Sequence, residues 1–145
     1  MIMKKIYSVK MTNTGGRTGE VFSEDHSLDL KIAAPGSGNA GATNPEQLFA
    51  AGYSACFNSA LELVMQKAGI NAKSTVAIVV SLYEKEPLDY MIGADIEGHI
   101  EGQSPEKTQE LLEKAHEVCP YSKATRGGQP PKTCPQIERV LGTIS

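Results

Sequence analysis

Residues 44–61 read Asn-Pro-Glu-Gln-Leu-Phe-Ala-Ala-Gly-Tyr-Ser-Ala-Cys-Phe-Asn-Ser-Ala-Leu, and this stretch predicts the helix around which the chain folds. Asn44 can accept hydrogen bonds from the first free amides, and Pro45 suits the first helical position. Glu46 places an anion near the positive end of the helix dipole. From there to about Met65 apolar residues recur on nearly every face, so we expect a helix that is buried on most sides.

Length, composition and charge are those of one ordinary globular domain. The chain has 145 residues, of which 40% are hydrophobic and 21% charged, and its net charge is −3. This charge argues against a nucleic-acid partner. The N-terminus lacks the apolar core of a signal peptide, and no segment is expected to reach the length of a membrane span. We therefore expect a cytoplasmic protein with no membrane partner.

Three cysteines stand at positions 56, 119 and 134. In a reducing cytosol cysteines are more often free, catalytic or metal-binding than paired in structural disulfides. None of the three belongs to a Cys-x-x-Cys pair, and the histidines are scattered, so no metal site is expected. Taken alone, Cys56 within an apolar helix fits a small buried hydrophobe.

The other segments predict an α+β fold. Strands are expected at residues 3–12, 20–23, 28–32, 75–83 and 90–101, with a glycine-rich turn at 14–19 and a loop of small residues at 34–43. A second helix is expected from Ser104 to near Pro120. Hairpins dominate over strand–helix alternation, which favours a mainly antiparallel sheet. The first helix is too apolar for one face to lie in water, so either the sheet or a second subunit must cover it.

Cys56 can act as a thiolate only if a cation reaches it, because a buried apolar site raises the pKa of a thiol. Arg17 is the candidate cation, although an exposed arginine in a hairpin is the simpler interpretation of its turn. Glu46 lies about 15 Å along the helix from Cys56 and about 80° around it, so it can anchor an arginine but not touch the thiol. Cys119 can capture a Cys56 sulfenic acid as a disulfide. Two buried structural cysteines are the alternative.

Two long motifs resemble those of the organic hydroperoxide resistance proteins, within the broader osmotically inducible protein C (OsmC) family. They are Asn44-Pro-Glu-Gln-Leu-Phe-Ala-Ala-Gly-Tyr-Ser-Ala-Cys56-Phe and Val118-Cys-Pro-Tyr-Ser-Lys-Ala-Thr-Arg-Gly127, and the segment 15–19 is similar to the family's arginine loop. The resemblance predicts one domain over 1–127. The family usually ends in a short apolar strand, whereas residues 128–145 form a divergent, proline-containing tail. We expect Cys134 in this tail to be a spectator, the alternative being that it competes for the disulfide, and only 137–144 to form a short helix or strand.

The resemblance implies an intertwined homodimer, with the sheet wrapped around long central helices that bear the cysteines. It implies a cysteine peroxidase that defends against oxidative stress by reducing organic hydroperoxides, including those of fatty acids, to alcohols. No metal, haem or flavin cofactor is implied. By the motif match Cys56 is the peroxidatic thiolate, Cys119 the resolving thiol, and Arg17 and Glu46 the activating pair. Dihydrolipoamide or a lipoylated protein is the implied reductant.

Phe49 and Phe57 are hypothesised to line the site for an alkyl chain. Two other functions stay open. The chain can belong to the sister branch of the same family, with broader peroxide use, or it can be a non-catalytic redox sensor that signals through a protein partner. Turnover with a dithiol separates these classes, because a sensor reacts once and stops.

Overall fold

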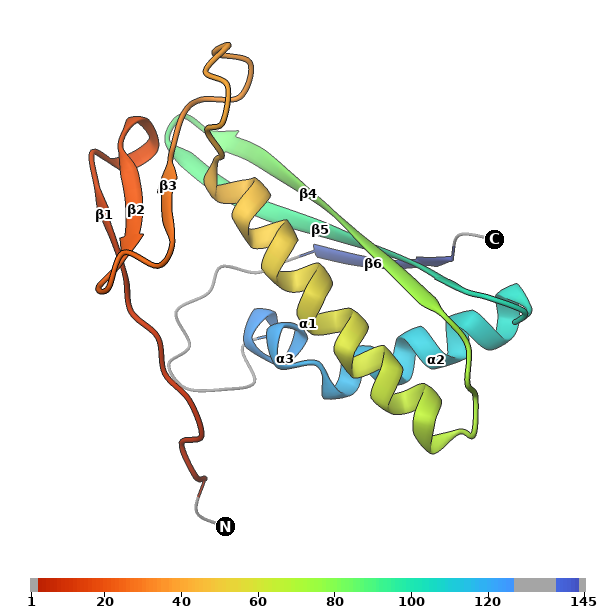
Figure 1. Ribbon diagram of the computed structural model, residues 1–145. Coiled ribbons are helices and arrows are strands. Elements are labelled where there is room, and N and C mark those ends of the chain that lie inside the picture. The colour runs from red at the N-terminus through yellow and green to blue at the C-terminus, as the bar shows by residue number, and fades with distance from the viewer. Residues whose placement is uncertain (1–2, 127–137, 144–145) are drawn as a thin grey trace. The chain divides into compact units, whose positions relative to one another are not determined.

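The computed structural model describes residues 3–126 and 138–143 and divides into two compact units, Met1–Leu48 and Phe49–Ser145. Along the chain, three strands precede a long helix, which is followed by two strands, two helices and a final strand (Figure 1). Both sheets contain antiparallel pairs, and three α-helices accompany them. The predicted α+β class is therefore confirmed.

The first unit contains a three-stranded antiparallel sheet in the order β1–β2–β3. Its strands are β1 (Met11–Thr14), β2 (Glu20–Ser23) and β3 (Asp29–Lys31), and a short 3₁₀ helix, η1 (Gly16–Thr18), joins the first two. Gly15 and Gly16 have φ angles of 79° and 59°, in the left-handed region that glycine adopts without strain. The predicted glycine-rich hairpin is confirmed.

The strand expected over residues 3–12 begins only at Met11. Residues 3–10 are exposed and have no regular structure. A strand needs a partner for its backbone groups, and no described strand pairs with these residues. The β-propensity of this segment is therefore not sufficient to order it as a strand.

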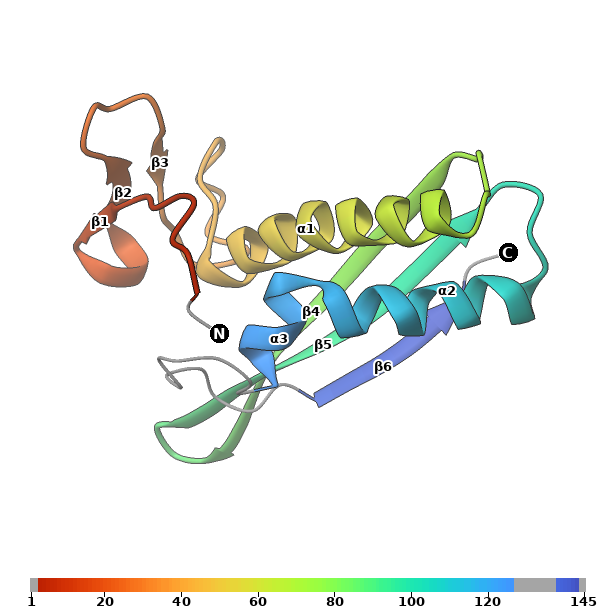
Figure 2. The same ribbon diagram turned by 90° about the horizontal axis from the view of Figure 1, so that it is seen from below.

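The second unit contains the sheet β4–β5–β6, formed by β4 (Ser74–Glu86), β5 (Asp89–Ile100) and β6 (Glu138–Thr143). β4 and β5 form a long antiparallel hairpin in which Ile78 lies opposite Ile96. β6 runs parallel to β5, with Gly93 opposite Glu138 and Gly98 opposite Thr143. The long helix α1 (Pro45–Lys67) and the helix α2 (Pro105–Val118) run beside each other along this sheet (Figure 2).

β6 corrects the expectation that the tail lacks a terminal strand. β4 occupies one edge of β5, and the other edge still presents backbone N–H and C=O groups. β6 pairs with that edge over six residues, so these groups find partners. The prediction of a short ordered segment within 137–144 is confirmed. Cys134 lies outside the described residues, and its spectator role stays a prediction.

The helix α1 (Pro45–Lys67) begins and ends where the sequence predicts. The Asn44 Oδ1 atom accepts a hydrogen bond of 2.8 Å from the Gln47 N–H. At the other end Gly69 has a φ of 73°, and the Ile70 N–H donates to the Met65 carbonyl at 2.9 Å. These bonds satisfy backbone groups that a helix end leaves without partners.

One face of α1 is buried against the rest of the second unit. That face presents Tyr53, Phe57, Leu61 and Met65, which pack with side chains of β5 and α2 in one cluster. The opposite side leaves Ala51, Ala55, Ser59 and Leu63 exposed. Within a single chain, the helix is thus covered along one face rather than on most sides.

By length and composition α1 would also suffice to cross a membrane, which corrects the expectation that no segment reaches that length. One such helix is weak evidence, because the core helix of a soluble protein meets the same criterion. One face of α1 belongs to the hydrophobic core of the second unit.

The helix α2 (Pro105–Val118) is followed at once by a short helix that the sequence did not reveal, α3 (Pro120–Thr125). The Ser104 hydroxyl oxygen caps α2 by accepting from the Lys107 N–H at 3.1 Å. Cys119 is extended, with φ −65° and ψ 124°, and separates the two helices. Pro120 explains both features, because a proline disfavours helical geometry in the preceding residue and suits the first position of a new helix.

Candidate active site

Cys56 on α1 and Cys119 between α2 and α3 lie next to each other in the second unit. Their Sγ atoms are 3.9 Å apart and both thiols are free. Cys119 is fully buried, whereas Cys56 is partly exposed. A disulfide bond is about 2.05 Å long, so the sulfurs need to approach by about 1.9 Å to form one. The pair is placed for a disulfide that closes with a small movement.

The turn into α3 supplies a hydrogen bond to Cys56 that the sequence did not reveal. The backbone N–H of Tyr121 donates to Cys56 and acts to lower the pKa of the thiol. Pro120 is the sequence feature that could have indicated this hydrogen bond. A helix that begins at a proline has free N–H groups in its first turn, and these can donate to a neighbouring side chain.

Gly52 gives Tyr121 room to lie against α1. A Cβ atom added to Gly52 would lie 2.3 Å from the Tyr121 hydroxyl oxygen and 3.1 Å from its Cζ atom. Gly52 is one helical turn before Cys56, on the same side of α1. The missing side chain at Gly52 therefore admits the residue whose N–H reaches the thiol.

The aromatic residues before Cys56 surround the Tyr121 ring. The ring of Phe49 meets those of Tyr53 and Tyr121 edge-on, with centroids 5.8 Å and 6.3 Å away. Phe57 is fully buried and contacts Tyr53 from within the core, at a centroid distance of 6.4 Å. The structure thus places Phe49 beside Tyr121 and Phe57 in the core. That either residue contacts an alkyl chain stays a prediction.

A groove of about 570 Å³ opens beside Cys56. Aliphatic groups of Leu63 and Val118 line it together with the polar side chains of Glu62 and Gln66. Leu63 and Val118 were missed in the sequence, although both carried a signal. Leu63 follows Cys56 by seven residues, about two helical turns, and Val118 directly precedes Cys119.

The electrostatic balance at Cys56 favours the neutral thiol within the second unit. Burial raises the pKa of Cys56 and is the largest influence, because it disfavours the charged thiolate. The Tyr121 N–H opposes this effect, whereas the neighbouring Cys119 adds to it. A reactive thiolate here needs a further positive charge.

Arg17 and Glu46 form an ion pair in the first unit. Arg17 Nη1 donates to Glu46 Oε2 at 3.0 Å, and Nη2 donates to Oε1 at 2.5 Å. This bond is the main reason that the pKa of Glu46 lies below its ordinary value and that of Arg17 above it. The Glu46 side chain is 14% exposed and that of Arg17 53% exposed. The predicted pairing of these two residues is present, and its action on Cys56 stays a prediction.

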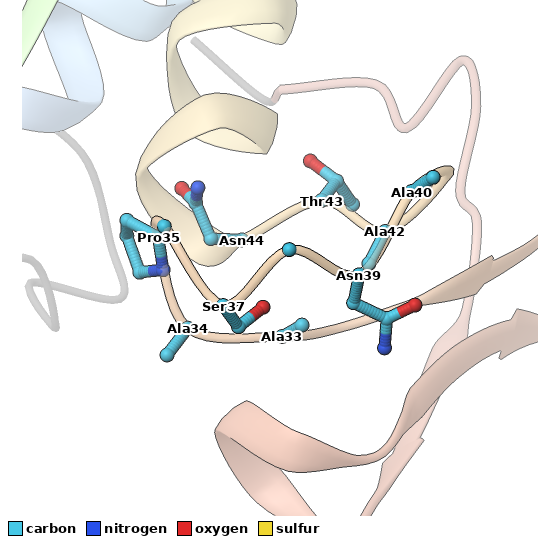
Figure 3. Close-up of a pocket in the computed structure, with 11 residues that line it drawn as sticks. Ala33, Ala34, Pro35, Ser37, Asn39, Ala40, Ala42, Thr43 and Asn44 are labelled. Atoms are coloured by element: carbon cyan, nitrogen blue, oxygen red, sulfur yellow. The ribbon is translucent and has the colours of Figure 1, made fainter.

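The loop before α1 surrounds a second hollow, of about 380 Å³ (Figure 3). Its lining consists of backbone and small side chains, among them Ala33, Ser37, Asn39 and Thr43. None of its lining residues is an acid, a base or a thiol. Residues 3–126 and 138–143 also contain no group of three or more His, Cys, Asp and Glu side chains that could hold a metal ion. The groove beside Cys56, whose lining includes this thiol, is the candidate active site.

Several known proteins are similar to this chain in sequence and in fold. The family model described as OsmC-like protein matches residues 36–133. The organic hydroperoxide resistance protein-like 2 of Staphylococcus epidermidis is 46% identical over 127 residues, which cover 84% of this chain and 89% of that protein. The organic hydroperoxide resistance protein OhrA of Bacillus subtilis is 44% identical over 127 residues, which cover 84% of this chain and 90% of that protein.

A solved structure extends the similarity to the fold. The crystal structure of the organic hydroperoxide resistance protein OhrB of Bacillus subtilis matches with a TM-score of 0.82 at 40% sequence identity. The match covers 97% of this chain and the whole of that chain.

Proposed function

Because this chain belongs to the OsmC-like family and, within it, to the organic hydroperoxide resistance proteins, we propose that it is a cysteine-based peroxidase that reduces organic hydroperoxides. The names of its relatives support a role in defence against peroxides. The observation that supports the chemistry is the 3.9 Å separation between the sulfurs of Cys56 and Cys119.

In the proposed cycle the Cys56 thiolate attacks the terminal oxygen of a hydroperoxide. The O–O bond breaks, the alkoxide takes up a proton and leaves as the alcohol, and Cys56 is oxidised to a sulfenic acid. The Cys119 thiol then attacks the Cys56 sulfur, so that an S–S bond forms and the sulfenic oxygen leaves as water. A dithiol finally reduces the disulfide and becomes a disulfide itself, which returns both cysteines to thiols. We propose dihydrolipoamide or a lipoylated protein as this dithiol.

The lining of the groove supports an organic substrate. Leu63 and Val118 offer aliphatic surface beside Cys56, where an alkyl or fatty-acyl substituent can be buried. Hydrogen peroxide has no such substituent and gains nothing from this surface. The proposed enzyme therefore prefers organic hydroperoxides.

Arg17 and Glu46 are proposed to activate the thiolate. Burial raises the pKa of Cys56, so its ionisation at neutral pH needs a cation. Arg17 is always charged, and its two bonds to Glu46 fix the orientation of the guanidinium. Glu46 in this proposal acts through Arg17.

We propose that the protein is an intertwined homodimer in the cytoplasm, with residues 1–127 as one domain and 128–145 as its tail. Two features support a second copy. Ala51, Ala55 and Leu63 leave an apolar face of α1 exposed, and residues 3–10 pair with none of the strands in the described part of the chain. Sedimentation of the purified protein is expected to give the mass of a dimer, and a monomer at micromolar concentration would contradict this part of the proposal.

The test of function is peroxide consumption by the purified protein. We expect multiple turnovers with dihydrolipoamide, a preference for tert-butyl or linoleic hydroperoxide over hydrogen peroxide, and no turnover in Cys56→Ser. Cys134→Ser should behave as wild type, whereas Cys119→Ser should accumulate sulfenic acid. If the wild-type protein consumes at most one equivalent with both dihydrolipoamide and the thioredoxin system, the peroxidase proposal fails and a redox sensor explains the cysteine pair better.

A further inference from the structure

Three buried polar side chains behind Cys119 connect α1, α2 and α3. The Ser122 Oγ atom lies 2.7 Å from the Tyr53 hydroxyl oxygen and 2.8 Å from His116 Nδ1. Ser122 is 0% exposed, Tyr53 1% and His116 5%. We refer to these three residues as the Ser122 network. The proposed peroxide chemistry uses none of them.

Arg126, which follows α3, forms hydrogen bonds with the last turn of α2. Its Nη1 atom donates to the His116 carbonyl at 2.7 Å, and its Nη2 atom donates to the Glu117 carbonyl at 3.2 Å. Both carbonyls belong to the last turn of α2, where helical partners are missing. The end of α3 is therefore fastened to the end of α2.

The direction of the hydrogen bonds follows from the Arg126 guanidinium. Its Nη1 atom lies 3.2 Å from His116 Nε2, and arginine can only donate, so Nε2 is the accepting nitrogen. Neutral His116 then carries its proton on Nδ1 and donates to the Ser122 oxygen. The Ser122 and Tyr53 hydroxyls share the next hydrogen bond, in which either oxygen can be the donor. Each buried polar atom on this path has a partner.

The Ser122 network connects the two cysteine-bearing segments at matched positions. Tyr53 precedes Cys56 by three residues and Ser122 follows Cys119 by three residues, close to one helical turn in each case. The Tyr53–Ser122 bond therefore joins the turn before one thiol to the turn after the other. A shift of α3 along or away from α1 would break this bond.

We propose that Ser122, Tyr53 and His116 are positioning residues that hold Cys119 where it closes a disulfide with Cys56. Cys119 is extended between two helices, so rotation about this junction would carry α3 away from α1. The sulfurs need to close by about 1.9 Å, and a misplacement of about 1 Å can slow a reaction between fixed groups about a hundredfold. The network restricts that rotation. The role of the Ser122 network in catalysis rests on the proposed function, whereas its effect on the formation of the Cys56–Cys119 disulfide does not.

The first test measures the disulfide without peroxide. Full-length protein carrying Cys134→Ser is equilibrated with reduced and oxidised dithiothreitol, and the fraction that contains the Cys56–Cys119 disulfide is measured by alkylation and mass spectrometry. Two electrons and two protons pass from the protein thiols to the oxidised dithiothreitol. We expect the equilibrium constant for disulfide formation to fall about tenfold in Ser122→Ala and in Tyr53→Phe.

Two control variants separate positioning from a general loss of stability. Tyr83→Phe removes a tyrosine hydroxyl from a half-exposed position on β4 and should leave the equilibrium unchanged. Ile100→Val removes one methyl group from the core and lowers stability without removing any hydrogen bond of the Ser122 network. If Ile100→Val weakens the disulfide as much as Ser122→Ala does, the proposal is overturned.

The second test follows one equivalent of organic hydroperoxide in the same variants. Sulfenic acid at Cys56 should form in Ser122→Ala at the wild-type rate, and its conversion to the disulfide should be about tenfold slower. Wild-type values of both the conversion rate and the dithiothreitol equilibrium in Ser122→Ala and Tyr53→Phe would overturn the proposal. If wild type forms no sulfenic acid, the peroxidase function fails, and the dithiothreitol equilibrium still decides the positioning role.

Discussion

Replacing Gly52 with alanine should raise the pKa of Cys56, although this change removes no group that contacts the thiol. The new Cβ atom would lie 2.3 Å from the Tyr121 hydroxyl oxygen, whereas ordinary contacts begin at 3.4 Å. The Tyr121 side chain must therefore move by about 1.1 Å at its outer end. Because the backbone N–H of the same residue is bonded to Cys56, we expect this movement to lengthen or break that bond.

The size of the effect follows from the energy of the lost bond. A hydrogen bond to a charged group contributes about 1.5–3 kcal/mol. One pKa unit corresponds to about 1.36 kcal/mol and to a tenfold change in ionisation, so complete loss of this bond would raise the pKa of Cys56. The thiolate population at neutral pH would fall about ten- to a hundredfold. Alanine is also a better helix former than glycine by about 0.8–1.0 kcal/mol, so a weaker α1 cannot explain the result.

The assay is the ultraviolet absorbance of the thiolate as a function of pH. Cys119→Ser and Cys134→Ser are present in every sample, so that Cys56 is the thiol that titrates. Adding Tyr121→Phe to Gly52→Ala removes the hydroxyl and leaves Cζ, at 3.1 Å, as the nearest ring atom. The double variant should therefore titrate close to Tyr121→Phe alone. An unchanged pKa in Gly52→Ala would refute the assigned role of the Tyr121 N–H.

Three further predictions concern stability and ionisation. Glu46→Gln should lower the free energy of unfolding at neutral pH by less than about 1 kcal/mol, since its arginine partner is half-exposed. The folded-state pKa of Glu46 is lowered, so this difference should disappear in denaturant titrations as the pH falls through that pKa. Asp25 should titrate by NMR with a pKa of about 2, to which the Ser27 amide and hydroxyl both contribute by donating to this carboxylate, and Ser27→Ala should raise the pKa because it removes the hydroxyl. Leu61→Ala should cost about 2–5 kcal/mol of unfolding free energy, because the Leu61 side chain is fully buried in the core.

The elements that local rules specify were predictable from the sequence. Asn44 and Ser104 each accept the capping hydrogen bond that their positions indicated. The alternation along residues 90–101 produced β5, which ends at Ile100. In these cases the residues that decide the structure lie within a few positions of one another, so a single segment contains the information.

The elements that depend on distant partners were not predictable in the same way. β6 forms because an edge of β5 about 45 residues away offers backbone groups, whereas residues 3–10 pair with no described strand and stay irregular. The helix α3 is fastened by Ser122 and Arg126 to side chains and carbonyls of other helices.

In the candidate site, too, the features carried by local motifs were predictable and those that depend on packing between helices were not. The motifs around Cys56 and Cys119 indicated that these thiols act together, and the structure places them in contact. The Tyr121 N–H and its dependence on Gly52 were not evident, because they arise from the way in which α3 crosses α1. A glycine within an apolar helix indicates close packing but does not name the residue that it admits.

The unequal burial of the two sulfurs has a consequence for the regiochemistry of reduction. In the proposed cycle, a thiolate that reduces the Cys56–Cys119 disulfide must approach in line with the S–S bond. The enclosed Cys119 sulfur offers no such approach, whereas the Cys56 sulfur borders the groove. The external reductant should therefore always form its mixed disulfide on Cys56 and expel Cys119 as the leaving group, so the cysteine that receives oxygen from the peroxide also receives the reductant.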